Sequence, residues 1–227
     1  SGKYATGDKQ EYRSLLTRSL TSVLFWAVPS SAGFIILREP LVRAVFYWGG
    51  KFTLADVSSV ASILVLFSVS IISQSVVAIL NRAFYALQDT KTPLLIGLAS
   101  AVTNLGLGAI FYMFTNLGAS GMALSYSIIS TINAIILLIK INRKTNGIHT
   151  EKVISFFVRA LPAALIMYAA VMFLEMIPVS LVTKGLQLLY LLAEIIIAAV
   201  VYTGIMLLLK AEDAIYLKHL IKQRLNM

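Results

Sequence analysis

The side chain best suited to bind a charged substrate is Arg82, which follows Asn81 at the end of a serine-rich apolar segment and precedes Gln88. A guanidinium binds phosphate through two parallel hydrogen bonds, and neighbouring side-chain amides supply further donors. We therefore interpret these residues, together with Arg18 and Gln74, as candidates for binding an anionic group. The alternative for each arginine is a side chain that only reaches toward a membrane surface, and for Gln74 it is a hydrogen bond between helices.

Glu194 is a further candidate for substrate binding, because it lies inside an apolar segment. An ionisable side chain in such a segment is a functional hypothesis by default, and the alternative is a protonated carboxyl that bonds a neighbouring helix. His149 and His219 stand alone, cysteine is absent and the acidic residues are scattered, so neither a metal site nor a general acid–base pair is indicated. The sequence predicts a protein that is not an enzyme and has no cofactor.

The segments that must position these residues are long and apolar. Of the 227 residues, 59% are hydrophobic and 13% are charged, and the mean hydropathy is +0.86, which is far from the composition of a water-exposed domain. About 20 apolar residues in a helix cross the ~30 Å core of a bilayer. We expect an all-α polytopic membrane protein with six transmembrane helices, near residues 15–37, 54–80, 94–114, 119–139, 153–177 and 186–209.

Shorter signals describe the segments between and after these helices. Thr53 is a candidate cap for the second helix, and the polar residues 81–93 are expected to connect the second helix to the third. Residues 41–48 are too few to cross a bilayer and end in a tyrosine and a tryptophan, so they predict a short interfacial helix. Residues 211–227 alternate basic and apolar side chains, which is typical of an amphipathic helix on an anionic lipid surface.

Basic residues are distributed unevenly between the two sides of the predicted helices. Fifteen of the 19 Lys and Arg residues fall on the side that holds both chain ends, and the other side has only Arg38, Arg43, Lys51 and Lys184. Because cytoplasmic loops carry an excess of basic residues, both termini are expected in the cytoplasm. The net charge of +9 is therefore interpreted as a signal of topology and not of nucleic-acid binding.

Three motifs occur in the order found in one family of membrane transporters. Residues 82–93 read RAFYALQDTKTP and resemble the fYA-x-x-D-T-K-T-P signature of the MurJ (MviN) flippases. Residues 29–33 (PSSAG) and 46–53 (FYWGGKFT) resemble the proline-small-glycine helix and the F-x-x-G-x-F-T loop of that family. Asn104 with residues 118–125 (GASGMALS) resembles its later N…G-x-x-G-x-A-x-S pattern. The resemblance covers most of the first four predicted helices.

The resemblance implies the carboxy-terminal half of a transporter in the multidrug/oligosaccharidyl-lipid/polysaccharide exporter superfamily. These flippases move lipid II, the undecaprenyl-pyrophosphate-linked peptidoglycan precursor, across the bacterial cytoplasmic (inner) membrane for cell wall biogenesis. Their fourteen helices form two lobes with alternating access, and the last two helices form a groove for the lipid tail. Residues 1–145 would then be part of the second lobe, and residues 146–227 would be the groove with a cytoplasmic amphipathic tail.

The same resemblance implies what else the transporter needs. The amino-terminal lobe and its cavity arginines are missing, so we expect them on a separate chain unless this chain is a cleaved or truncated product. Some relatives bind sodium through an Asn and an acidic residue one turn later; Asn104 matches the first, but Gly108 offers no carboxylate. The expected partners are lipid II and membrane lipids. The alternatives are a polysaccharide or drug exporter of the superfamily, or a non-transporting membrane subunit.

Overall fold

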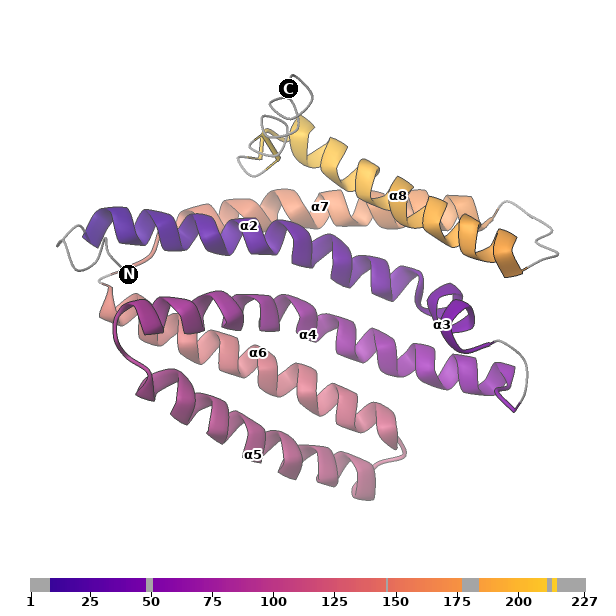
Figure 1. Ribbon diagram of the computed structural model, residues 1–227, viewed down its shortest axis with the longest axis horizontal. Coiled ribbons are helices and arrows are strands. Elements are labelled where there is room, and N and C mark those ends of the chain that lie inside the picture. Colours follow the sequence, from indigo (N-terminus) through magenta and orange to yellow (C-terminus); the bar gives the residue numbers. More distant parts are fainter. Residues whose placement is uncertain (1–8, 48–50, 146, 177–183, 212–213, 216–227) are drawn as a thin grey trace. The chain divides into compact units, whose positions relative to one another are not determined.

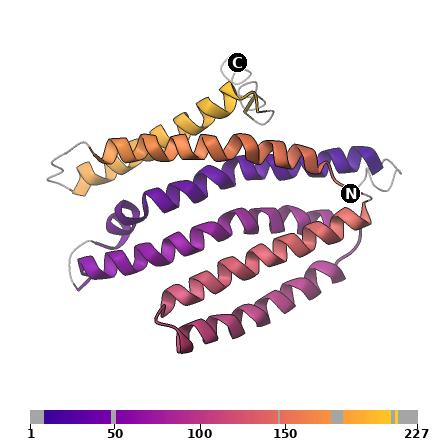
Figure 2. The same ribbon diagram turned by 180° about the vertical axis from the view of Figure 1, so that it is seen from behind.

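The computed structural model describes residues 9–47, 51–145, 147–176, 184–211 and 214–215. In these residues the chain forms helices joined by short connections, without a strand (Figures 1 and 2). The helices are α2 (Lys9–Ile36), α3 (Arg38–Phe46), α4 (Leu54–Ala86), α5 (Lys91–Phe114), α6 (Ala119–Lys144), α7 (Thr150–Glu175) and α8 (Lys184–Leu208).

Six of these helices, all except α3, are long and apolar enough to cross a membrane. The shortest of the six, α5, has 24 residues, which extend about 36 Å at ~1.5 Å per residue. The six transmembrane helices predicted from the sequence are therefore confirmed, as is the all-α class. Many large apolar side chains remain exposed, for example Leu105 on α5 and Leu165 on α7, as is expected where lipid is the solvent.

The second transmembrane helix is longer than the sequence predicts. Residues 81–86 were expected to begin a polar connector, whereas α4 continues through them to Ala86. Ala83 and Phe84 are buried in the apolar core, so their packing favours another turn and a half of helix despite the polar neighbours Asn81 and Arg82. The connector between α4 and α5 is consequently short.

The short helix after the first span is confirmed, but α3 begins at Arg38 instead of Leu41. Pro40 lies in its first turn, where a missing backbone N–H costs no hydrogen bond. Thr53 caps α4 as predicted: its N–H donates to Asp56 Oδ2 (2.7 Å), and the Asp56 N–H donates back to Thr53 Oγ1 (3.3 Å). The predicted amphipathic helix at 211–227 lies almost wholly outside the described residues.

The chain divides into two compact units, which we describe separately. The first unit comprises Ser1–Ala27 and Ile63–Ile154, and the second comprises Val28–Ser62 and Ser155–Met227. The helices α2, α4 and α7 each contribute to both. These units are defined by compactness, whereas the division predicted at residue 145 separates two functions, a transporter lobe and a lipid-tail groove. The division by function stays a prediction.

The core of the first unit joins the beginning of α2 to the end of α4 and the end of α6. Its members are buried apolar side chains: Tyr12, Leu16, Leu20, Val77, Leu80, Ala83, Phe84, Ala134, Leu137, Ile141 and Ile148. The Tyr12 hydroxyl also donates to the Ala83 carbonyl oxygen across 2.8 Å. This hydrogen bond satisfies a buried hydroxyl and ties α2 to α4.

In the first unit, α6 lies between α4 and α5 (Figures 1 and 2). Small residues allow α5 and α6 to approach closely, and a Cβ at Gly121 would lie 2.7 Å from Phe111 Cβ. On its other side α6 bonds α4, where the hydroxyls of Ser73 and Thr131 are 2.8 Å apart. Hydrogen bonds of this kind position the polar side chains that the sequence singled out.

In the second unit, α7 and α8 each bury the side chains along one face of the helix. The buried side chains recur every three or four residues, as one face of a helix requires: Phe156, Ala160, Ala163, Met167 and Val171 on α7, and Leu191, Glu194, Ala198, Tyr202 and Met206 on α8. Glu194 is the only acidic member of these two buried sets. The buried face of α8 therefore places a carboxyl inside the unit.

Candidate functional site

The arginines predicted to bind an anion are both exposed in the first unit. Arg82 lies in the last turns of α4, and among the described residues it has neither a hydrogen bond nor an ion pair. Its guanidinium is therefore available for a ligand. Arg18 lies on α2. The structure thus gives two accessible cations, and whether they bind substrate stays a prediction.

The amides beside Arg82 differ in their surroundings. Asn81 is half-buried, and its Oδ1 atom has no hydrogen-bond partner in the described part of the chain. Gln88 is exposed and has a φ of 57°, so it occupies the left-handed conformation at which α4 ends. Both residues lie at the same end of α4 as Arg82. Their proximity along the chain agrees with the predicted group, but their role is untested.

Gln74 and Asn104 hold helices together. Gln74 Nε2 donates to the Tyr126 hydroxyl oxygen on α6 (3.0 Å). The Ser125 hydroxyl lies 2.7 Å from Asn104 Oδ1 and 3.0 Å from the Asn104 carbonyl oxygen on α5. These hydrogen bonds agree with the helix-to-helix alternative given for Gln74, and its role in substrate binding stays a prediction.

The sodium site at Asn104 stays a prediction, and two contacts bear on it. The side-chain oxygen of Asn104 already accepts a hydrogen bond from Ser125. Gly108, one turn later, is buried, and a Cβ built there would lie 3.6 Å from Ser125 Oγ. No group of three or more His, Cys, Asp or Glu that could hold a metal is found among the described residues.

Asp89, in the same connector, makes contacts that were not foreseen from the sequence. Its Oδ1 accepts the Thr92 N–H (3.0 Å), while Oδ2 accepts the Thr92 hydroxyl (2.8 Å) and lies 2.6 Å from Lys144 Nζ. The Lys144 ammonium and the Thr92 N–H lower the pKa of Asp89 to about 2. We call Asp89, Thr92 and Lys144 the Asp89 cluster. It caps α5 and fastens the end of α6 to the connector.

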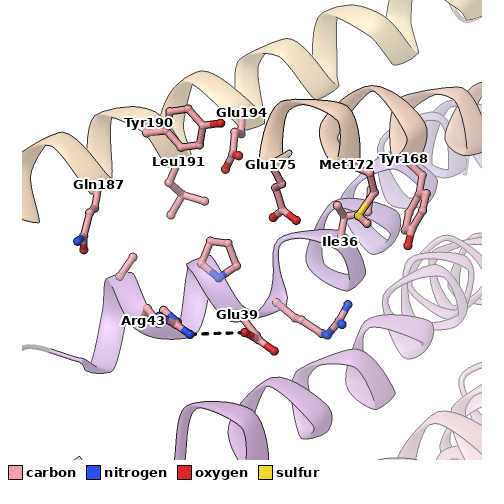
Figure 3. Close-up of a pocket in the computed structure, with 13 residues that line it drawn as sticks. Ile36, Glu39, Arg43, Tyr168, Met172, Glu175, Gln187, Tyr190, Leu191 and Glu194 are labelled. Carbon is pink, nitrogen blue, oxygen red and sulfur yellow. Dashed lines mark ion pairs between the residues drawn. The ribbon is translucent and has the colours of Figure 1, made fainter. Parts of the chain in front are cut away.

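The second unit contains a cavity of about 680 Å³ between the end of α2, α3, α7 and α8 (Figure 3). Its lining mixes apolar, aromatic and charged side chains: Ile36, Arg38, Glu39, Pro40, Arg43, Ala44, Tyr168, Met172, Glu175, Gln187, Tyr190, Leu191 and Glu194. We call it the α3–α8 cavity. Such a lining is typical of a ligand site that needs both orientation and apolar contact.

Glu194 is the predicted site residue that lies in this cavity. It is 2% exposed, and its Oε1 atom has no hydrogen-bond partner within the described ranges. In Figure 3 the side chains of Glu194 and Glu175 approach the cavity from α8 and from the end of α7. Glu194 belongs to the second unit, whereas the other candidates belong to the first.

Sequence reasoning missed most charged residues of the α3–α8 cavity. Glu175 ends α7, and Arg38, Glu39 and Arg43 lie on α3. In the sequence, Arg38 and Arg43 served only to assign topology, and the two acids were not singled out. One signal was available in the sequence. Four charged residues, Arg38, Glu39, Arg43 and Glu175, lie near the loops on the side of the predicted helices that has few basic residues. That signal does not identify which of them face one cavity.

Known proteins resemble this chain over most of its length. The family model for the lipid II flippase MurJ matches residues 1–212. A protein of Bdellovibrio bacteriovorus named probable lipid II flippase MurJ is 28% identical over 207 residues, covering 91% of this chain and 39% of that protein. One of the same name from Buchnera aphidicola subsp. Acyrthosiphon pisum is 33% identical over 165 residues, covering 72% of this chain and 32% of that protein.

A solved structure has the same fold. The lipid II flippase MurJ in an inward closed conformation aligns with a TM-score of 0.71 at 24% identity, over 95% of this chain and 41% of that one. The match thus spans about two fifths of the Bdellovibrio protein and of the solved structure, and about a third of the Buchnera protein. The resemblance inferred from the DTKTP motif is confirmed, and the match over residues 1–212 places the chain in the lipid II flippase MurJ family.

Proposed function

We propose that this chain is the carboxy-terminal part of a lipid II flippase, which carries the lipid-linked precursor across the bacterial cytoplasmic membrane by alternating access. The observation that carries the proposal is the family match over residues 1–212, together with relatives that are named lipid II flippases. Six helices that can cross a membrane agree with a transporter. Lipid II is accordingly its substrate, and the chain acts by transport and not by catalysis.

The exposed guanidinium of Arg82 is proposed to bind the anionic pyrophosphate of the substrate. Arg82 has no partner among the described residues and lies beside Asn81, whose Oδ1 is also unpaired in that part of the chain. A free guanidinium is the protein group best matched to phosphate oxygens. Arg18 and Gln88 would add a second cation and an amide. Gln74 has a weaker case, because its amide already bonds Tyr126.

The last two transmembrane helices are proposed to cradle the apolar tail of the lipid. Large apolar side chains on their outer faces support this role, because they offer contact surface to a hydrocarbon chain: Val158, Leu161, Leu165 and Phe173 on α7, and Leu189, Ile196 and Val200 on α8 are exposed. Glu194 on α8 points inward among buried residues. The tail would therefore run along the outside of α7 and α8.

Both termini are proposed to lie in the cytoplasm. In the first unit, contacts such as Tyr12 with Ala83 and Asp89 with Lys144 gather the helix ends that the basic residues assign to one side. In the second unit, Lys184 Nζ donates to the Tyr47 carbonyl oxygen (2.6 Å), which joins two ends assigned to the other side. The excess of Lys and Arg on the first side supports its cytoplasmic orientation.

Translocation is proposed to need the remainder of the family's length as well. Relatives are more than twice as long as this chain, since it covers about 39% of the first of them. An alternating-access cycle rocks one lobe against another around a shared site. The other lobe would be supplied by the same polypeptide or by a separate one.

Substitution of Arg82 tests the proposal in cells. Complementation of a flippase-depleted strain by the complete transporter should be lost with Arg82→Glu and retained in part with Arg82→Lys, because only the cation attracts pyrophosphate. Lipid II that reacts with a membrane-impermeant reagent at the cell surface should fall in parallel. Arg143→Glu is the matched control, an exposed arginine at the end of α6.

Two results would contradict the proposal. Growth at the wild-type rate by Arg82→Glu, at equal abundance in the membrane, would remove Arg82 from the substrate site. Normal surface exposure of lipid II in cells that lack the transporter would indicate another cargo, such as a polysaccharide precursor or a drug.

A further inference from the structure

The α3–α8 cavity contains a carboxyl group that the protein leaves incompletely bonded. Glu194 is 2% exposed, and its Oε1 atom has no hydrogen-bond partner among the described residues. The hydroxyl of Tyr190, one turn earlier on α8, lies beside Glu194 in Figure 3, and it donates to the Leu174 carbonyl oxygen (2.9 Å). A buried carboxyl oxygen without a hydrogen bond, as Oε1 is among the described residues, is costly. A ligand that brings positive charge and N–H donors would remove this cost.

The charges around the cavity do not balance. The Arg43 guanidinium pairs with the Glu39 carboxylate (3.7 Å, dashed in Figure 3). Arg38 Nη1 donates to a carbonyl oxygen of α2 (3.0 Å). The remaining charged groups of the lining are the guanidinium of Arg38 and the carboxyl groups of Glu175 and Glu194, so acidic side chains outnumber basic ones by one. A ligand with a single positive charge would balance this count.

The size and lining of the cavity favour an organic cation. Its volume of about 680 Å³ far exceeds the ~30 Å³ that one water molecule occupies in the liquid. The rings of Tyr168 and Tyr190 and the side chains of Met172 and Leu191 line it beside the carboxylates. Aromatic rings attract cations, and apolar side chains contact the carbon atoms attached to an ammonium nitrogen. A bare metal ion has no carbon atoms to place against these apolar side chains.

We propose that the α3–α8 cavity binds a primary alkylammonium group. Its nitrogen pairs with Glu194 and Glu175, and its carbon atoms lie against Tyr168, Tyr190 and Leu191. An –NH₃⁺ group has three donors and no acceptor, which suits a cavity whose unpaired groups are carboxylate oxygens. The group can come from an aminophospholipid headgroup or from a soluble amine. The proposal does not depend on the identity of the transported lipid.

Binding of a soluble amine tests the chemistry. The full chain in phosphatidylglycerol nanodiscs is titrated with n-butylammonium chloride while thermal unfolding is followed. The unfolding temperature should rise with n-butylammonium and not with n-butanol, which lacks the charge, or with sodium chloride at equal ionic strength. Glu194→Gln should weaken apparent binding about tenfold or more, because an amide cannot replace a buried ion pair. Glu175→Gln should weaken it less.

A matched control separates loss of binding from loss of charge. Glu151 is an exposed acid in the first turn of α7, it belongs to the first unit and it pairs with His149. Glu151→Gln makes the same chemical change outside the cavity and should leave amine binding within about twofold, as is usual for an exposed pair. The two glutamine variants are equal in net charge, so their difference reports on the site.

A second arm identifies the source of the amine. The chain is delipidated from nanodiscs that contain equal amounts of phosphatidylethanolamine and phosphatidylglycerol, and the bound lipid is counted by native mass spectrometry. Retention of phosphatidylethanolamine that Glu194→Gln abolishes would assign the site to a lipid headgroup. Binding of n-butylammonium without such retention would assign it to a soluble amine.

The proposal fails under two outcomes. Equal stabilisation by n-butylammonium of wild type and Glu194→Gln would place amine binding elsewhere. A wild-type chain that responds neither to n-butylammonium nor to phosphatidylethanolamine would leave Glu194 with a proton as its only positive partner, and the cavity would not be an ammonium site.

Discussion

Two carboxyl groups of this chain, one in each compact unit, are treated differently by the fold. Asp89 is 17% exposed at its side chain and accepts hydrogen bonds from the Thr92 N–H and hydroxyl while it pairs with Lys144. Glu194 is 2% exposed, yet its Oε1 atom has no partner among the described residues. The more accessible carboxylate is thus fully bonded, and the more buried one is not.

This difference agrees with a structural role for Asp89 and with the ligand-binding role that we propose for Glu194. A carboxylate that caps one helix and holds the end of another stabilises the fold. A buried carboxyl oxygen without a hydrogen bond lowers stability, so we expect a ligand or partner to complete it. The signature motif therefore contains a stabilising residue, Asp89, whereas the residue most in need of a ligand lies on α8, outside the motif.

The largest stability effect should follow from Asp89→Ala. The substitution removes the cap of α5 and leaves the Lys144 ammonium without its ion-pair partner. The free energy of unfolding should therefore fall by about 2 kcal/mol. Lys144→Ala should cost less, because Asp89 keeps both bonds to Thr92. Thermal unfolding of the purified chain measures both. If the two variants were equally stable, the cap would contribute nothing.

Acid should remove the part of this stabilisation that needs an ionised Asp89. Its pKa is about 2 in the folded chain, against an ordinary value of 3.8. A lowered pKa means that the stabilisation is complete above pH 3.8 and is lost as the pH falls toward 2. The difference in unfolding temperature between wild type and Asp89→Asn should narrow over that interval. A difference that is constant with pH would contradict the ion pair with Lys144.

Glu194→Leu should have the smallest effect on stability and the opposite sign. In phosphatidylglycerol without an amine, loss of an incompletely bonded carboxyl should leave the free energy of unfolding unchanged or raise it by about 1 kcal/mol. Chemical unfolding with Glu151→Leu as control measures this change. A loss of several kcal/mol would show that Glu194 is a structural residue like Asp89, and the contrast between the two units would disappear.

Several features of the fold could be predicted from the sequence because they depend on local chemistry. A bilayer requires about 20 apolar residues for each crossing, so the runs of apolar residues located six helices. The Thr53 cap was also predictable, because its partner Asp56 is three residues away. The DTKTP motif indicated the family correctly. These features need no knowledge of which helices touch.

The end of α4 could not be predicted in this way. The sequence RAF with its neighbours reads as the start of a polar connector, yet the helix runs on to Ala86 because Phe84 packs against the beginning of α2. Tyr12 and Ala83, which share a hydrogen bond, are 71 residues apart. The apolar partner that extends the helix is therefore invisible in any local window.

By itself, the sequence determined that this chain has six helices that can cross a membrane and that it belongs to one transporter family, and it identified Glu194 as an ionisable group inside a helix. The tertiary structure decided which residues each charged side chain contacts. Asp89 meets Lys144 over a separation of 55 residues, and Glu194 shares its cavity with α3 and α7. Apolar runs reflect a local cost of transfer into lipid, whereas pairing of charges depends on which helix faces pack together.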